Sequence, residues 1–303
     1  MVSEENLAYD YYKRTCPNLE AIVKKEIIDF SLTDPTSAAA FLRLFFHDCQ
    51  VQGCDASILL DHGHRGEGSE MASSRNFAIK KRELIGHIKF ILELECPRQV
   101  SCADIIALAA KEAVTISGGP DIRIPLGRKD STTCSNRQAD AQIPSPKISA
   151  SEFLHMFASK GMNIEESVAI LGAHTLGVGH CINIVDRIYD SKPSNKMDFS
   201  FKALLRLQCP TLIPFTNVTS IPIDATPLVF DNQYYKDAVM GRGLLSIDSR
   251  IAFHPQTAPT FRRFENDQSY FFQVFSSAFA KLSSTNVLSG TKGEIRRYCN
   301  RVN

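Results

Sequence analysis

The sequence predicts a mainly α-helical protein with very little β structure. Segments rich in apolar residues and alanine recur along the chain, and they begin and end at residues that favour helix termini. Strand-like patterns are rare, and the best candidate is the short stretch 121–126. With 303 residues, 44% of them hydrophobic, the chain can bury a substantial core in one large domain or two lobes.

The first expected helices are defined by their boundary residues. Asp34 is a suitable N-cap, and Pro35 would occupy the first helical position before the run 37–42. Segment 103–116 carries Ala and Leu at helical spacing, and the residues Gly118–Pro120 stop it. We therefore expect two helices in the first 120 residues that are rich in alanine and apolar side chains.

Further helices are expected in the second half of the chain. Asn163, followed three residues later by Glu166, forms a start like a capping box for a helix over 164–174. Segments 230–240 and 270–282 also have helical patterns.

Two stretches are expected to be irregular. Segment 138–149 contains Pro144-Ser145-Pro146, and residues that precede proline favour extended conformations. This segment is a natural seam between two lobes, about 1–145 and 146–303. Segment 211–227 is polar and dotted with prolines, which predicts a long loop.

The charge balance excludes some classes of partner. Lys and Arg total 34 against 33 Asp and Glu, so the net charge of +1 gives no reason to expect nucleic-acid binding. No run of 18 apolar residues occurs, so no membrane-spanning helix is predicted.

The nine cysteines favour disulfides over metal binding. They are spread along the chain without a CxxC pair, which argues against zinc ribbons and thioredoxin chemistry. Disulfides in an oxidising compartment are the better interpretation, and the odd count leaves at least one thiol over. Asn217, in the sequon Asn217-Val218-Thr219, is a glycosylation candidate and agrees with a secreted route.

The stretch from Arg43 to Ser57 concentrates reactive groups. Arg43 and His47 are four residues apart, so on a helix they share a face. A neutral imidazole there can take a proton while the guanidinium stabilises negative charge on the neighbouring atom. An oxygen-rich segment between Cys49 and Cys54 follows at once. The pattern indicates a catalytic helix next to a site for a hard cation.

A second histidine, His174, lies at the end of the expected helix 164–174, where nearby glycines leave room for a bulky group to approach the backbone. Thr175, segment 224–226 and Asp231 supply the oxygen atoms that Ca²⁺ prefers. Taken singly, such a histidine is more often a core or capping residue, and each aspartate is more often a helix cap.

At this point the chain resembles a known family, the class III haem peroxidases, which are secreted plant enzymes. The matching segments occur in the family's order and are 12–18, 42–48, 53–60, 100–105, 125–130, 171–177, 230–235 and 293–296. The resemblance covers nearly the whole chain, and two histidine motifs with eight cysteines in register are highly specific. It implies a single peroxidase domain over 1–303, a monomer, with one haem b between a distal and a proximal helical lobe.

The resemblance also implies catalytic roles on the distal side. His47 would be the acid–base group that takes a proton from H2O2, and the side-chain oxygen of Asn76 would fix its tautomer. Arg43 would stabilise the developing charge, and Phe46 would wall the pocket. Water leaves, and phenolic or other aromatic donors are then oxidised in two one-electron steps.

On the proximal side, the resemblance makes His174 the iron ligand. Asp248 would accept the other ring N–H of His174. Glu70 would link the distal calcium to the region of Asn76. Pro144 would line the entrance for aromatic donors, besides linking the lobes.

The resemblance further implies two Ca²⁺ ions and four disulfides. The distal calcium ligands would be Asp48, Val51, Gly53, Asp55 and Ser57. The proximal ligands would be Thr175, Asp224, Thr226, Val229 and Asp231. The disulfides would be Cys16–Cys96, Cys49–Cys54, Cys102–Cys299 and Cys181–Cys209, which leaves Cys134 as a free thiol.

The sequence departs from the family in a few places. Stretch 70–89 lacks the usual Pro-Asn and Arg-Gly-Phe elements. Asp224 stands two residues before Thr226, where three is usual, and Ile223 replaces a common Phe. The chain has no tryptophan, so donors must reach the haem edge or use a tyrosine.

Three functions remain to be compared. The leading one is a phenol-oxidising, H2O2-dependent haem peroxidase that is secreted to the extracellular space or cell wall, or delivered to the vacuole. A rival is a structural or binding protein on the same fold, stabilised by calcium and disulfides, with the chemistry lost. A third is a zinc protein that uses His47, Cys49 and Cys54.

Overall fold

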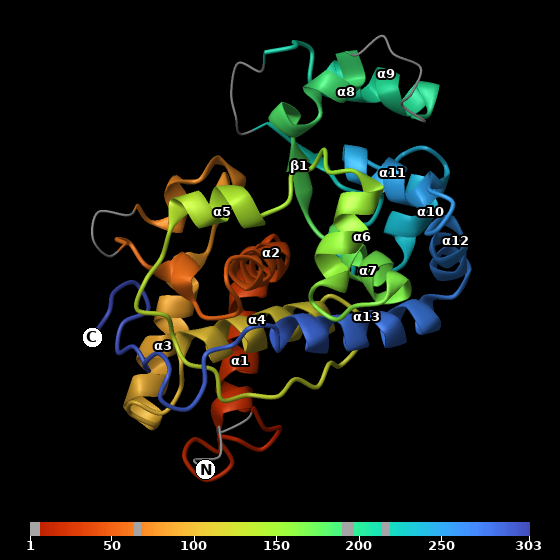
Figure 1. The fold of residues 1–303 in the computed structure, drawn as a ribbon. Coiled ribbons are helices and arrows are strands. Elements are labelled where there is room, and N and C mark those ends of the chain that lie inside the picture. Colours follow the sequence, from red (N-terminus) through yellow and green to blue (C-terminus); the bar gives the residue numbers. More distant parts are fainter. Residues whose placement is uncertain (1–6, 64–67, 190–196, 214–218) are drawn as a thin grey trace. The chain divides into compact units, whose positions relative to one another are not determined.

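The computed structural model describes residues 7–63, 68–189, 197–213 and 219–303. It is mainly helical, which confirms the predicted fold class (Figure 1). Its described residues form one small antiparallel sheet, in which β1 (Val178–His180) pairs with β2 (Ser220–Pro222). Among the described residues, no helix has the length and apolar character needed to cross a membrane.

The chain divides into two compact units. The first contains Met1–Ile116, Asp121–Pro144 and Phe279–Asn303, and the second contains Ser117–Pro120 and Ser145–Ala278. The seam after Pro144 lies within the segment expected to separate two lobes. The assignment of residues 279–303 to the second lobe was wrong, because these residues belong to the first unit.

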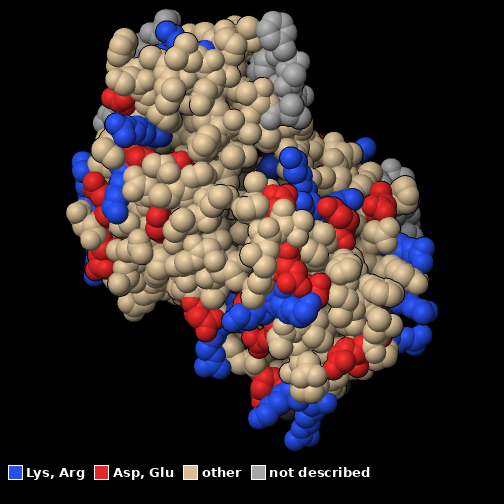
Figure 2. Space-filling view, turned by 180° about the vertical axis from the view of Figure 1, so that it is seen from behind, with Lys and Arg blue, Asp and Glu red and all other residues tan. Residues whose placement is uncertain are grey.

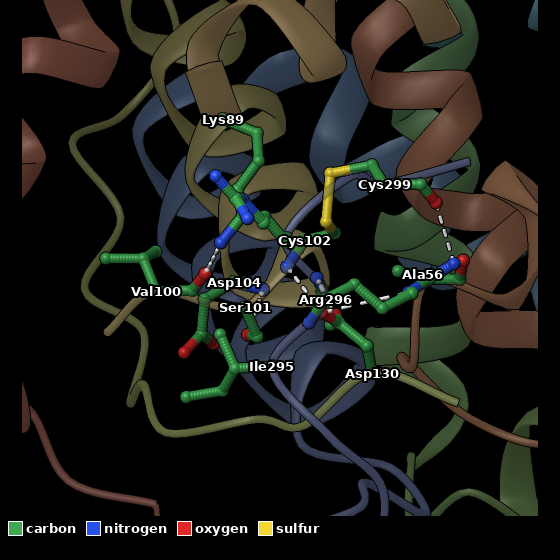
Figure 3. The surroundings of a disulfide bond; sticks show 12 residues. Ala56, Lys89, Val100, Ser101, Cys102, Asp104, Asp130, Ile295, Arg296 and Cys299 are labelled. Carbon is green, nitrogen blue, oxygen red and sulfur yellow. Dashed lines mark hydrogen bonds and ion pairs between the residues drawn. A yellow bond between two sulfur atoms is a disulfide. The ribbon is translucent and has the colours of Figure 1, made fainter. Parts of the chain in front are cut away.

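The C-terminal segment is held in the first unit by a buried network (Figure 3). Cys299 forms a disulfide with Cys102. Arg296 is fully buried, and its guanidinium donates to the main-chain oxygens of Ala56 (2.6 Å) and Cys299 (2.7 Å). Its backbone N–H donates to Oδ2 of Asp130 (2.9 Å). These contacts join distant parts of the chain, and no local pattern could reveal them.

The first unit is built around one buried helix. Its helices are α1 (Leu19–Thr33), α2 (Ser37–Gln50), α3 (Arg82–Glu95), α4 (Cys102–Ile116) and α5 (Asn136–Gln142), with short 3-10 turns at η1 (Ser57–Leu59), η3 (Glu70–Ala72) and η4 (Ser74–Asn76). Helix α4 contacts α1, α2 and α3 and is buried along almost its whole length. Most of its residues can be apolar because protein surrounds it. Helix α2 therefore packs on a rigid core.

The second unit contains most of the remaining helices. They are α6 (Ala150–Ala158), α7 (Ile164–Ile170), η5 (Leu171–Thr175), η6 (Cys181–Asn183), α8 (Val185–Tyr189), α9 (Phe199–Gln208), α10 (Gln233–Val239), α11 (Ser246–Phe253), α12 (Ala258–Asn266) and the greater part of α13 (Gln268–Ser283). Its core is a cluster of fully buried aromatic side chains: Phe230, Tyr234, Tyr235, Phe261, Phe264 and Phe271.

Several predicted helix ends need correction. Asp34 does not cap α2; its Oδ1 accepts bonds from the backbone and hydroxyl groups of Thr36, which itself occupies the N-cap position. The capping box of Asn163 and Glu166 is present, but α7 ends at Ile170 and the chain continues as a 3-10 turn.

The expected extended segments also changed. Stretch 121–126 is not a strand: only Leu126 pairs, through a single antiparallel bridge to Ala8. Without a longer neighbouring strand, its backbone cannot form a ladder. Stretch 138–149 begins inside α5, because the N-cap Ser135 accepts a hydrogen bond from the backbone N–H of Gln138 and starts a helix there. Only residues 143–149, between α5 and α6, are irregular.

Candidate active site

Helix α2 presents Arg43 and His47 on one face. Nε of Arg43 donates to Nε2 of His47 (3.3 Å). On the other side of the ring, Nδ1 of His47 lies 2.7 Å from Oδ1 of Asn76. Nδ2 of Asn76 donates to the main-chain oxygen of Glu70 (2.9 Å), which fixes the orientation of the amide. The imidazole therefore carries its proton on Nδ1 and has its lone pair on Nε2.

The surroundings keep His47 neutral. Burial, reinforced by the charge of Arg43, lowers the pKa of His47 to about 3. Burial also lowers the pKa of Arg43 to about 10, so Arg43 remains a cation at neutral pH. The ring of Phe46 stands edge-on to His47, with centroids 5.9 Å apart. Base, cation and aromatic wall thus occur together in the first unit.

His174 is held by a buried carboxylate in the second unit. It lies in the 3-10 turn η5, and its Nδ1 is 3.0 Å from Oδ1 of Asp248. Asp248 is fully buried, and its Oδ2 accepts the backbone N–H of Leu245 (2.7 Å). Histidines that ligate metals commonly donate their second ring N–H to such a carboxylate. The geometry leaves Nε2 of His174 as the atom that can bind a metal.

One glycine near His174 has a different role from the one expected. A Cβ on Gly172 would lie 2.4 Å from the ring of Phe271 and 2.7 Å from the hydroxyl of Tyr235. The space beside Gly172 is therefore filled by the aromatic core of the protein.

Two side chains next to Asp248 were not predicted. The hydroxyl of Tyr234 donates to Oδ1 of Asp248 (3.1 Å). Arg187 is buried and donates to the main-chain oxygens of Gly243 and Leu244 and to the hydroxyl of Ser249. Tyr234 lies within the recognised motif 230–235, which could have drawn attention to it, whereas the sequence around Arg187 has no such signal.

The residues expected to hold the distal calcium contain unsatisfied oxygens. Asp48 Oδ1, Ser57 Oγ and both carboxylate oxygens of Glu70 are buried without a hydrogen-bond partner. Burial, together with the negative charge of Asp55, raises the pKa of Asp48 well above its usual value, and burial raises the pKa of Glu70 to about 8. Buried, unpaired carboxylates are costly unless a cation compensates them. The residues present therefore fit a hard cation.

The proximal calcium residues lie together despite the shortened spacing. The hydroxyl of Thr175 is 2.7 Å from Oδ2 of Asp224, 3.2 Å from Oδ1 of Asp231 and 3.4 Å from the main-chain oxygen of Val229. The hydroxyl of Thr226 is 3.2 Å from the same oxygen of Asp231. Burial raises the pKa of Asp224 to about 6. This set also has the oxygen chemistry of a calcium site.

Side-chain carboxylates alone could not complete either of the two expected calcium sites. In the part of the chain that the structure describes, no three His, Cys, Asp or Glu side chains form a metal-binding group. Carbonyl and hydroxyl oxygens would have to complete each shell, as is common for Ca²⁺ but not for zinc.

The four disulfides in the structure are the pairs that the resemblance implies: Cys16–Cys96, Cys49–Cys54, Cys102–Cys299 and Cys181–Cys209. The zinc hypothesis was therefore wrong, because Cys49 and Cys54 have no thiolate to offer a metal. Cys134 is buried and belongs to none of the four pairs. Pro144 is partly exposed beyond α5, and Asn217 lies outside the described residues.

Comparisons with known proteins agree with this chemistry. The sequence model of the peroxidase family matches residues 19–267. Peroxidase 29 of Arabidopsis thaliana is 50% identical, and the alignment covers 99% of this chain and 90% of that protein. Peroxidase 17 and Peroxidase 57 of the same plant are each 39% identical, over 100% and 98% of this chain and over 92% and 93% of their own lengths. The chain therefore belongs to the class III haem peroxidases of plants, enzymes that use H2O2 to oxidise donor molecules.

Proposed function

We propose that this peroxidase oxidises phenolic and other small aromatic donors, with His47 as its acid–base group and His174 as the ligand of one haem b. The single observation that carries the proposal is the His47–Asn76 pair, in which a buried, neutral imidazole has a defined tautomer. Haem, when bound, supplies the iron that binds peroxide and stores its two oxidising equivalents.

His47 acts on the protons of H2O2. Its Nε2 takes the proton from one peroxide oxygen and returns it to the other, so that the departing oxygen leaves as water. In the structure this lone pair accepts a hydrogen bond from Nε of Arg43, and the proton of peroxide would take the place of that donor. Arg43 must turn away as peroxide enters, and its charge then stabilises the departing oxygen.

The pair of His174 and Asp248 is suited to holding iron in the ferric state. A buried carboxylate that accepts the N–H of the ligand raises the basicity of the ligand. This arrangement favours cleavage of the peroxide O–O bond over reversible binding of a small molecule.

Family membership implies haem and calcium, and we assign two calcium ions to the two oxygen-rich sets. The distal ion would neutralise Asp48, which directly follows His47 in α2, together with Asp55. The proximal ion would bind Thr175, which directly follows His174. Each ion would thereby fix the position of a functional histidine.

We propose small-molecule partners only, a monomeric state, and secretion to the cell wall or delivery to the vacuole. Acidic and basic side chains are interspersed on the face drawn in Figure 2, without a large area of one sign that would favour nucleic acid. The four disulfides favour an oxidising compartment. Pro144 is proposed to border the donor entrance and Asn217 to carry a glycan.

An absorption spectrum of the purified protein, before and after one equivalent of H2O2, tests the proposal. We expect a Soret band that shifts with peroxide, and bound calcium by elemental analysis. The His47→Ala variant should keep the Soret band but lose the rapid shift. A Soret band that peroxide leaves unchanged in the wild type would instead support the rival, a structural protein on the peroxidase fold.

A further inference from the structure

One oxygen of Asp248 receives two hydrogen bonds. Nδ1 of His174 lies 3.0 Å and the hydroxyl of Tyr234 lies 3.1 Å from the same atom, Oδ1. The second oxygen accepts the backbone N–H of Leu245 (2.7 Å). The carboxylate is fully buried, so its charge is shared among these three donors.

Tyr234 is held rigidly in this position. It is buried in the aromatic core, and its ring stands perpendicular to the imidazole of His174, with centroids 5.7 Å apart. Phe261 and Tyr235 pack against it. A carboxylate oxygen can only accept, so the Tyr234 hydroxyl, 3.1 Å from Oδ1 of Asp248, is the donor in this contact.

We propose that Tyr234 is a positioning residue that weakens the hydrogen bond between Asp248 and His174 and so limits the electron density that His174 passes to iron. Hydrogen bonds to a carboxylate stabilise its charged form and make it a poorer acceptor for any further donor. Because Tyr234 and His174 share one oxygen, each bond weakens the other. The inference rests on the proposed role of His174 as the iron ligand.

Arg187 acts in the same direction. Its buried guanidinium donates to the main-chain oxygens of Gly243 and Leu244 and to the hydroxyl of Ser249, the residue that follows Asp248. A cation near Asp248 further stabilises the carboxylate, and the contacts fix the segment that carries it. Tyr234 and Arg187 together offset part of the basicity that Asp248 gives to the ligand.

The neighbouring tyrosine provides a matched control. Tyr235 is as deeply buried, but its hydroxyl lies 3.1 Å from the main-chain oxygen of Val168 and 3.2 Å from that of Ala169, not near Asp248. Tyr234→Phe and Tyr235→Phe thus remove the same atom from the same aromatic core.

The test measures the midpoint potential of the ferric–ferrous couple and the iron–imidazole stretching frequency of the ferrous haem protein. Tyr234→Phe is expected to lower the potential and raise the frequency, because Asp248 then binds His174 more strongly. Tyr235→Phe is expected to change neither. Wild-type values in Tyr234→Phe, or equal shifts in both variants, would overturn the inference.

Two further measurements keep the outcome clear. The proposed role of His174 fails if the wild type lacks an iron–imidazole band or if His174→Ala retains it. If the band is present in the wild type but has the same frequency in Tyr234→Phe, only the inference about Tyr234 fails. Should Tyr234→Phe not take up haem, 3-fluorotyrosine placed at position 234 preserves the shape and is a stronger donor. It is expected to raise the potential, and no shift would count against the inference.

Discussion

Oδ1 of Asn76 lies 2.7 Å from Nδ1 of His47, and the other end of the same amide is bound to the main-chain oxygen of Glu70. The contact joins helix α2 to the 3-10 turns η3 and η4. A short, buried chain of hydrogen bonds, from the main-chain oxygen of Glu70 through Asn76 to His47, therefore sets the tautomer of the imidazole. The side-chain carboxylate of Glu70 itself has no hydrogen-bond partner.

Replacing Asn76 with Val is expected to slow the reaction with H2O2 by about 10²-fold, at the low end of what a general base contributes. Without the acceptor on Nδ1, the proton of the ring can move to Nε2 and block the base. Stopped-flow measurement of the Soret change gives the rate. Asn18→Val, at an asparagine that binds Glu95 on the surface, is the matched control and is expected to react like the wild type. An unchanged rate in Asn76→Val would show that the amide does not set the tautomer.

The pH dependence of the same rate follows from the pKa of about 3 for His47, against an ordinary value of 6.5. The rate constant is expected to stay level as the pH falls from about 7 to about 4, and to halve near pH 3. A midpoint near pH 6 would mean that burial and Arg43 do not hold the ring neutral.

The same shift affects stability with a definite sign. Between pH 6.5 and about 3 the native ring is neutral, whereas the ring in the unfolded chain takes up a proton. The unfolded state then binds more protons, so the contribution of His47 lowers the free energy of unfolding as the pH falls through this window. Denaturant titrations of wild type and His47→Phe, at pH 7 and pH 4, isolate this contribution: the wild type is expected to lose more stability than the variant.

Calcium removal is expected to lower the melting temperature by several degrees, because Asp48, Asp55 and Glu70 then remain buried without a compensating cation. The rate of the reaction with H2O2 is expected to fall as well, because Asp48 directly follows His47 in α2 and the main-chain oxygen of Glu70 holds the amide of Asn76. Thermal unfolding with a chelator, and after calcium is restored, measures both effects. Glu70→Gln is neutral with and without calcium, whereas burial raises the pKa of Glu70 to about 8 and only a bound cation would favour its charged form. The variant is therefore expected to depend less on calcium; equal melting temperatures with and without calcium would refute the distal site.

Much of the fold could be predicted from local patterns. Apolar residues at helical spacing and helix-terminus signals predicted α4, α7 and α13, because these signals act within a few residues. Local signals could not assign residues 279–303 to the first unit, because the contacts of Arg296 with Ala56 and Asp130 cross the chain. The false strand at 121–126 had a suitable composition but lacked a partner strand.

The candidate site was predictable to a similar extent. Arg43 and His47 share a helical face because of their spacing alone. Asn76 required the family resemblance, since nothing local links it to His47. Tyr234 and Arg187 escaped notice because their relevance depends on how α10 and α8 approach the segment that carries Asp248.

The disulfides are expected to stabilise the protein according to the length of chain that they close. Cys102–Cys299 spans 197 residues and Cys181–Cys209 spans 28, and all four cysteines are buried. Because of loop-closure entropy, the longer bridge is expected to contribute about 2 kcal/mol more to the free energy of unfolding than the shorter one. Replacing each pair with alanine and measuring urea unfolding compares the two variants under matched conditions. The variant without Cys102–Cys299 is expected to lose more stability, also because the bridge holds the segment that buries Arg296 against Asp130. An equal or smaller loss would mean that chain entropy and this anchored segment contribute little to the stability of the first unit.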